Sequence, residues 1–286
     1  MTTYLTGSNG LRLAADVGGP DDGPTVVLLH GGGQTRHSWA GTWRVLVEAG
    51  WHAWSLDLRG HGESDWSEDG DYSLDAFAGD IVAVTATLPT PPILVGASLG
   101  GLTSLVAVTE APDPEHVARA LVLVDVAHRV EVAGRERIGA FMTGNIDGFA
   151  SLEEAADAIA AYNPHRPRPT DLSGLAKNLR QRPDGRWVWH WDPRFVMGKF
   201  GSADETRASV IDPHRLEAAV DALRLPALLV RGRSSDLLSE EGAQDFLARV
   251  PHAEFADVAG AGHMVAGDRN EVFNRAILDF LERHRT

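Results

Sequence analysis

Ser98 is the first residue in this sequence whose surroundings point to chemistry, because it lies in the pattern G-x-S-x-G between Gly96 and Gly100. A serine hydroxyl attacks a carbonyl carbon when a neighbouring base accepts its proton. The apolar residues before Ser98 predict a strand and those after it predict a helix, so the chain must turn sharply there. Glycines leave room at such a crossing. We expect Ser98 to be a nucleophile; the alternative is a tight turn without chemistry.

A nucleophilic serine needs a histidine and an acid that orients it. His263 lies in the small-residue loop AGAGHMV near the end of the chain and is the expected base. Two carboxylates end predicted strands, Asp236 in RGRSSDLLS and Asp125 after ALVLV. We favour Asp236, because the turn at Gly232 begins a more open loop. Asp125 is then a structural or pocket residue.

Two glycine-rich stretches follow other predicted strands. The amides of HGGG at residues 30–33 are unshielded by side chains, which suits an anion-binding pocket, and we expect His30 to hold this loop by hydrogen bonds. Phosphate binding is disfavoured because no Gly-Lys-Ser or G-x-G-x-x-G follows. The stretch DLRGHGESD at 57–65 is interpreted as a turn pinned by Asp57 and Arg59. His61 has no partner at metal-ligand spacing, so we predict no metal site.

Unbroken apolar runs alternate with segments of helical spacing, which predicts an α/β fold with a mostly parallel central sheet and flanking helices. An Asn-Gly turn between residues 4–6 and 11–17 adds an antiparallel hairpin at the start. The expected buried strands are residues 25–30, 52–58, 92–97, 120–125, 227–232 and 255–258. The expected helices are residues 38–49, 74–87, 99–109, 240–250 and 270–283.

This alternation stops between residues 130 and 212, where amphipathic pieces at 131–142, 151–162 and 172–182 surround a proline-rich connector. We predict a core domain made of residues 1–129 and 213–286, with residues 130–212 inserted as a mainly helical unit.

The amino-acid composition limits the classes of molecule that this protein can bind. The net charge of −14 disfavours nucleic acid and acidic membrane surfaces. The absence of cysteine excludes disulfides and thiolate-bound metals. We see neither a signal peptide nor a run of about 20 apolar residues. We therefore expect a cytoplasmic protein whose partner is a small-molecule substrate, without a membrane partner; the oligomeric state stays open.

Taken together, HGGG, DLRGHGES, GASLGG, RGRSSD and GAGHM in this order resemble the α/β-hydrolase fold superfamily, in its branch of esterases, lactonases, C–C bond hydrolases, epoxide hydrolases and cofactor-free perhydrolases. The resemblance implies a triad of Ser98, Asp236 and His263 and no cofactor. It implies an oxyanion hole made by the amides of Leu99 and Gly32, with Gly33 as the alternative. It also implies that residues 130–212 form a helical cap over the site.

A serine nucleophile, rather than the aspartate of epoxide hydrolases, favours acyl chemistry. The expected activity is hydrolysis of a small carboxylic ester or lactone through an acyl-enzyme on Ser98. The alternatives are a cofactor-free perhydrolase, a C–C bond hydrolase and a non-catalytic binding module. Trp187, Trp189 and Trp191 either line an acyl pocket or hold the cap on the core. The expected pocket residues are His37, Trp39, Met142, Trp191, Leu238 and Met264, with Phe141 and Phe195 on weaker grounds.

Overall fold

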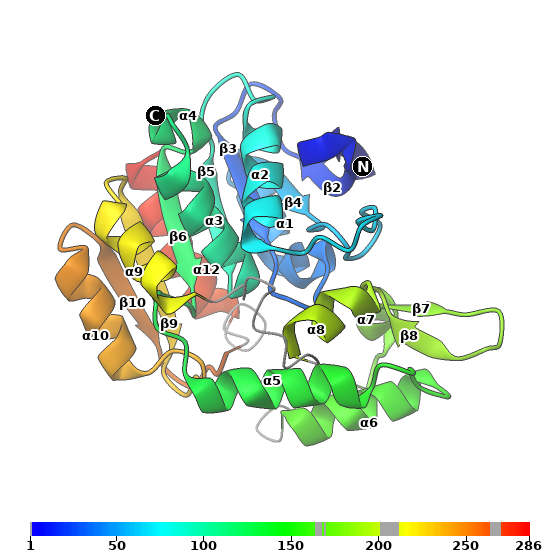
Figure 1. The fold of residues 1–286 in the computed structure, drawn as a ribbon. Coiled ribbons are helices and arrows are strands. Elements are labelled where there is room, and N and C mark those ends of the chain that lie inside the picture. The colour runs from blue at the N-terminus through cyan, green and yellow to red at the C-terminus, as the bar shows by residue number, and fades with distance from the viewer. Residues whose placement is uncertain (1, 164–167, 169, 201–211, 264–269) are drawn as a thin grey trace.

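The computed structural model describes residues 2–163, 168, 170–200, 212–263 and 270–286, which form an α/β architecture around one large sheet (Figure 1). Eight described strands lie in the order β1-β2-β4-β3-β5-β6-β9-β10. β1 and β2 are antiparallel to each other, and β2 is antiparallel to β4. The remaining pairs are parallel. The predicted mostly parallel sheet is therefore confirmed.

The opening hairpin forms where the Asn-Gly signal places it. β1 (Thr2–Thr6) and β2 (Arg12–Gly18) are joined through the 3-10 turn η1 (Ser8–Gly10). Asn9 and Gly10 both take positive φ, 58° and 76°. Asparagine and glycine tolerate this left-handed region, which other residues rarely enter.

The central strands match the predicted apolar runs to within two residues. They are β3 (Thr25–Leu29), β4 (His52–Leu56), β5 (Ile93–Ala97), β6 (Ala120–Val124) and β9 (Ala227–Gly232), with β10 (Glu254–Val258) at the edge. β3, β6 and β9 are buried along their whole length, as expected of strands covered on both faces. The carboxyl ends of the parallel strands lie along one rim of the sheet. Ser98 directly follows β5 at this rim, and Asp125 directly follows β6.

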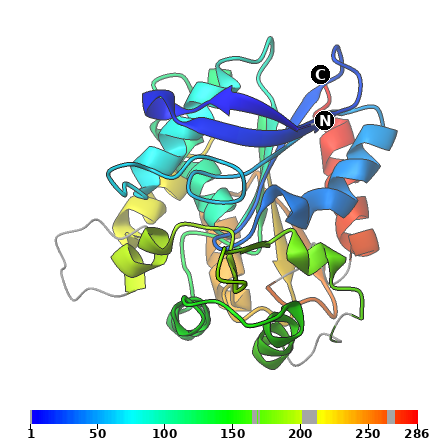
Figure 2. The same cartoon turned by 90° about the vertical axis from the view of Figure 1, so that its right-hand side faces the viewer.

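Helices cover both faces of the sheet (Figure 2). On one face lie α1 (Ala40–Glu48) and α12 (Asn270–Arg283), whose apolar side chains share a cluster with Val26, Leu28 and Val95. On the other lie α2 (Leu74–Thr85), α3 (Leu99–Glu110), α9 (Pro213–Ala222) and α10 (Glu240–Arg249). The short α4 (Pro114–Val117) follows α3. Side-chain caps from Ser73, Asp212 and Ser239 begin α2, α9 and α10 by accepting backbone N–H bonds.

The insertion lies across the carboxyl ends of the strands, below the sheet in Figure 1. It contains α5 (Val132–Gly144), α6 (Leu152–Tyr162), α7 (Ser173–Ala176), the hairpin of β7 (Leu179–Gln181) with β8 (Trp187–Trp189), and α8 (Pro193–Phe200). The first two predicted helical pieces are found. The third, residues 172–182, is wrong beyond α7, because a turn with Gly185 at φ 87° folds the chain back into the hairpin.

Apolar side chains of the insertion join the cluster that holds the core helices α2 and α3. Met142, Phe149, Trp189, Trp191 and Phe195 all belong to it. The insertion is therefore packed on the sheet domain rather than tethered beside it. Within the described residues, none of the helices combines the length and apolar character needed to cross a membrane.

Candidate active site

Ser98 occupies a sharp turn between β5 and α3, as its flanking glycines predict. Its φ of 47° and ψ of −114° lie outside the regions that side chains normally allow. A Cβ on Gly96 would lie 2.4 Å from the carbonyl oxygen of Gly100, and a Cβ on Gly100 would lie 2.4 Å from that of Leu29. Only glycine fits at either position. The backbone strain therefore falls on Ser98, the residue that the sequence predicts as the nucleophile.

Asp125 follows β6, the strand beside β5, and its carboxylate is fully buried. Its Oδ2 accepts a hydrogen bond from Nδ1 of His263 at 2.7 Å. Its Oδ1 accepts from the amide of Gly232 at 2.8 Å, and Oδ2 also accepts from the hydroxyl of Ser235. The φ of Asp125 is 52°, a second left-handed residue at the same rim. Three donors, one of them His263, thus hold this buried carboxylate in place.

Adjacent strand ends bring Ser98 and this pair together. The amide of Ser98 donates to the carbonyl of Val124, the residue before Asp125, at 3.2 Å. The loop that carries His263 packs on the end of β9, where a Cβ on Gly232 would lie 2.2 Å from the carbonyl of Gly262. No hydrogen bond joins Ser98 to His263 in the part of the chain that is described. Such bonds commonly tighten only when substrate binds.

The expected pairing of Asp236 with His263 is not found. Asp236 is more than one third exposed and pairs with Arg137 of α5 at 2.8 Å, so it connects the loop after β9 to the insertion. The hydroxyl of Ser235 accepts from the amides of Leu237 and Leu238, which folds this loop into a compact turn. The open loop assumed from the Gly232 turn is therefore wrong, and the carboxylate near His263 is Asp125, the alternative from the sequence.

The glycine loop after β3 presents the amide of Gly32. The amide of Gly31 donates to Oε1 of Gln34 at 3.1 Å, and that of Gly33 donates to Nε2 of His61 at 3.1 Å. The Gly32 amide has no partner in the described part of the chain. A Cβ on Gly31 would lie 3.4 Å from Cβ of Ser98, so the loop passes beside the serine. Leu99 begins α3, so its amide has no carbonyl within the helix.

His30 holds this loop as expected. It is fully buried, its Nδ1 donates to the carbonyl of Gly31 at 2.8 Å, and its Nε2 accepts from the amide of Leu58 at 3.0 Å. Burial lowers the pKa of His30, with Asp57 opposing that shift. His30 is therefore a neutral structural histidine with both ring nitrogens in use.

Asp57 and Arg59 hold the turn at residues 57–65, as expected. Asp57 accepts from the amides of Arg36 and Glu63 and pairs with the Arg36 guanidinium. Arg59 pairs with buried Asp80 of α2 at 2.7 Å. Gly62 at φ 54° lies directly over the Asp57 carboxylate, where a Cβ would lie 2.1 Å from Oδ2. Sequence reasoning recognised the turn but missed that Asp57 reaches back to the segment after the glycine loop.

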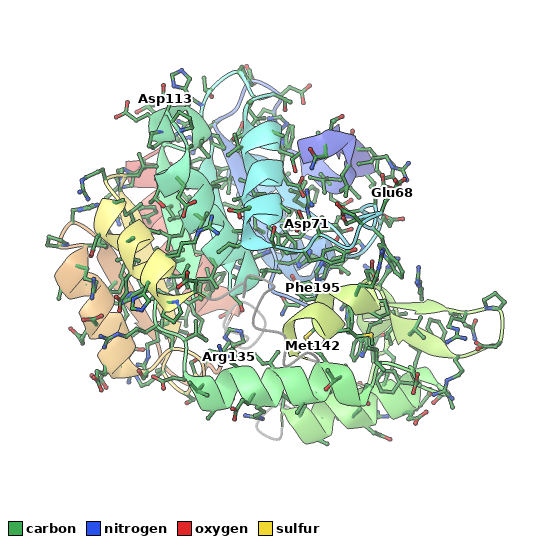
Figure 3. All side chains as sticks on the ribbon, in the orientation of Figure 1. Glu68, Asp71, Asp113, Arg135, Met142 and Phe195 are labelled. Atoms are coloured by element: carbon green, nitrogen blue, oxygen red, sulfur yellow. The ribbon has the colours of Figure 1, made fainter. Side chains whose placement is uncertain are left out.

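Two of the expected pocket residues lie against the glycine loop. A Cβ on Gly33 would lie 2.8 Å from Cε of Met142 and 3.8 Å from Nε1 of Trp191. Phe195, expected on weaker grounds, lies 3.2 Å from the corresponding position on Gly32. Figure 3 labels Met142 and Phe195 on the side of the insertion that faces the core. Trp191 also pairs with His61 through an isolated antiparallel bridge, so it joins the insertion to the core.

The structure does not bring the other expected pocket residues to this loop. Trp39 is buried in the core on the α1 and α12 side, stacked on Phe273. Leu238 is fully buried in the core cluster. Met264 lies outside the described residues. Runs of apolar side chains in the sequence do not distinguish core from pocket, because both demand the same residue types.

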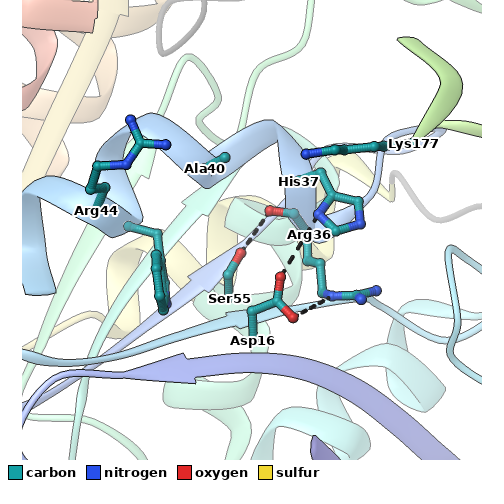
Figure 4. A pocket seen from close by; sticks show the side chains of 8 residues that line it. Asp16, Arg36, His37, Ala40, Arg44, Ser55 and Lys177 are labelled. Carbon is teal, nitrogen blue, oxygen red and sulfur yellow. Dashed lines mark hydrogen bonds and ion pairs between the residues drawn. The ribbon is translucent and has the colours of Figure 1, made fainter. Parts of the chain in front are cut away.

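His37 lines a cavity of about 210 Å³ whose other lining residues include the charged Asp16, Arg36, Arg44 and Lys177 (Figure 4). Arg36 lies between Asp16, Asp57 and Glu63. Although burial lowers the pKa of Arg36, these carboxylates raise it above its usual value. Neither Ser98 nor His263 lines this cavity. Among the described residues, no three His, Asp or Glu side chains converge as a metal-ligand set.

Comparisons with known proteins agree with this fold. A model of the alpha/beta hydrolase fold family matches residues 24–269. The esterase Rv0045c of Mycobacterium tuberculosis is 34% identical over 254 residues, which are 86% of this chain and 78% of that protein. A solved structure of that esterase superposes with a TM-score of 0.76 at 30% identity, over 99% of this chain and 92% of the other.

Two further relatives extend the comparison. A 3-hydroxybutyrate-oligomer hydrolase of Cupriavidus necator is 29% identical over 216 residues, 72% of this chain and 71% of its own length. The structure of an E-2-(acetamidomethylene)succinate hydrolase has a TM-score of 0.84 at 23% identity, with 99% of each chain covered, which shows the shared fold. The family match, the esterase relative and the strand order lead to one conclusion: this chain belongs to the alpha/beta hydrolase fold family.

Proposed function

We propose that this protein is a serine hydrolase that cleaves a small carboxylic ester or lactone through an acyl-enzyme on Ser98. The observation that carries the proposal is the strained Ser98 at the end of β5, beside a buried Asp125 that holds His263 from the next strand. The esterase and the oligomer hydrolase among the relatives support ester hydrolysis as the reaction.

In the proposed reaction, Nε2 of His263 accepts the proton of Ser98 as Oγ attacks the substrate carbonyl carbon. The electron pair of the carbonyl moves to oxygen, and the amides of Gly32 and Leu99 donate to that oxyanion. When the carbonyl re-forms, the bond to the alcohol breaks and His263 returns its proton to the leaving oxygen. Water then attacks the acyl-enzyme by the same steps in reverse order and frees the acid.

Asp125 is the proposed triad acid. With Nδ1 of His263 donating to Asp125, Nε2 is the ring nitrogen left to accept a proton. The carboxylate also stabilises the imidazolium that forms during each proton transfer. Asp236 is assigned no part in this chemistry, because its partner is Arg137.

Residues 130–212 are the proposed cap. Met142, Trp191 and Phe195 from this unit lie against Gly32 and Gly33, so they border the proposed oxyanion hole. Their side chains are buried and apolar or aromatic. We therefore expect the acyl group of the substrate to be small and uncharged.

The test is covalent labelling of the purified protein with a fluorophosphonate, which reacts with activated serines. Intact mass should show one adduct on the wild type and none on Ser98→Ala, with peptide mapping placing the adduct on Ser98. Circular dichroism of both proteins controls for folding. A folded wild type that stays unlabelled, or an equally labelled Ser98→Ala variant, would contradict the proposal and favour a binding module.

A further inference from the structure

His61 is a buried histidine that the proposed triad does not use. Its side chain is fully buried, Nδ1 lies 2.9 Å from the carbonyl oxygen of Arg59, and Nε2 lies 3.1 Å from the amide of Gly33. A carbonyl only accepts and an amide only donates. Nδ1 therefore carries the proton and Nε2 is the acceptor, so the geometry selects one neutral tautomer.

The glycine loop needs such an anchor. Three consecutive glycines have little conformational preference of their own, and Gly33 takes φ 78°. The peptide groups on either side of Gly32 must be fixed by hydrogen bonds if its amide is to stay aimed at one point. Gln34 supplies the bond on the Gly31 side and His61 supplies the bond on the Gly33 side.

The insertion holds His61 in turn. The amide of Gly62 donates to the carbonyl of His190 at 2.6 Å, and that of Asp192 donates to the carbonyl of Gly60 at 2.8 Å. These two main-chain bonds flank His61. The ring of Phe195 meets the His61 ring edge-on, with centroids 4.7 Å apart, and also contacts the position above Gly32. His61 therefore lies between the insertion and the glycine loop.

We infer that His61 is a positioning residue, an inference that rests on the proposed function. His61 orients the Gly32 amide toward the oxyanion, and it connects the insertion to the proposed oxyanion hole. Gly60 and Gly62 on either side take φ of 70° and 54°, so this short loop has the shape that main-chain pairing to His190 and Asp192 requires. Displacing the insertion segment would move His61 and, through Gly33, the proposed oxyanion donor.

The experiment compares His61→Met with His61→Gln. Methionine fills similar space without a strong acceptor, whereas Oε1 of glutamine can accept from the Gly33 amide. For hydrolysis of a p-nitrophenyl ester we expect kcat of His61→Met to fall about 10- to 100-fold, because removing an oxyanion donor costs about 100- to 1000-fold and here it is only misaligned. We expect KM to change less than about threefold and His61→Gln to recover most of kcat.

A trifluoromethyl ketone, which forms a tetrahedral adduct on serine, gives the second readout. Its inhibition constant should weaken in His61→Met by the same factor as kcat, since both depend on the oxyanion hole. Equal kcat in all three proteins, or a loss in His61→Met that glutamine does not restore, would overturn the inference. An inert, unlabelled wild type would instead refute the proposed function, so the two failures are distinguishable.

If both variants fail to fold, the wild type still tests the inference. In ¹⁵N spectra of the uniformly labelled protein at pH 7.5, His61 should show a protonated Nδ1 and an unprotonated Nε2. In the same protein the Gly33 amide should shift when the tetrahedral inhibitor binds. A His61 protonated at Nε2, or a Gly33 amide unchanged by the inhibitor, would overturn the inference.

Discussion

The carboxylate of Asp125 receives hydrogen bonds from His263, Gly232 and Ser235 at the end of β6. This arrangement leaves the carboxylate little freedom to rotate and directs one oxygen at the imidazole. The sequence offered Asp125 and Asp236 as alternatives. Both follow buried strands, so the choice depends on how the loop after β9 folds. The hydroxyl of Ser235 determines the fold of this loop, because it bonds to Asp125 and to the amides of Leu237 and Leu238. The periodicity of the sequence does not predict these hydrogen bonds.

At the residue scale, Asp125→Asn should lower kcat for a short ester by about 10⁴-fold, because an amide at this position stabilises the wrong histidine tautomer. Asp236→Asn removes only a partly exposed ion pair with Arg137 and serves as the matched control. Its kcat should stay within about threefold of the wild type. Stopped-flow hydrolysis of a p-nitrophenyl ester measures both variants. The reverse ranking would return the acid to Asp236.

The helices and strands match the ranges predicted from the sequence where burial of apolar residues determines the structure. They differ from those ranges where a turn determines it. The strands β3, β6 and β9 and the helices α2, α3 and α12 lie within two residues of the predicted ranges, since their apolar patterns are unbroken. Residues 172–182 also have helical spacing and predict a helix, but residues 179–181 form β7 instead. What overrides that spacing is pairing with the strand that follows Gly185, a contact beyond the local pattern.

At the element scale, Gly100→Ala should destabilise the turn between β5 and α3. The added methyl would lie 2.4 Å from the carbonyl oxygen of Leu29, so β3 or α3 must shift. We expect the free energy of unfolding to fall by about 3 kcal/mol in urea denaturation. Gly144→Ala at the end of α5 is the control, since no atom lies within 4 Å of the added methyl. That variant should be neutral or up to about 1 kcal/mol more stable. Equal stability of the two variants would contradict this packing.

At the scale of the whole molecule, several histidines are neutral because they are buried. Burial lowers the pKa of His30 and of His128 below the ordinary value of 6.5, although Asp57 and Asp245 oppose those shifts. In the unfolded chain both would bind protons near pH 6.5, whereas in the folded chain they stay neutral. The unfolded state therefore binds more protons, and stability falls as the pH drops through and below about 6.5.

Urea midpoints measured from pH 7.5 to 5.5 should consequently decrease. His128→Gln keeps a donor toward Asp245 but cannot titrate, so its midpoint should decrease less over the same range. Carboxylates with lowered pKa values, such as Asp192, lose their contribution only below their ordinary value of 3.8 and do not affect this window. A wild-type midpoint that is flat or rises toward pH 5.5 would show that these histidines are not buried neutral.

The measurement that tests the central claim most directly is kcat/KM for a short p-nitrophenyl ester and a simple lactone, with wild type and Ser98→Ala side by side. We predict turnover by the wild type and a loss of at least about 10⁴-fold in the folded Ser98→Ala variant, since the nucleophile and its acyl intermediate are gone. A folded variant that retains turnover within about tenfold of the wild type would contradict an acyl-enzyme on Ser98.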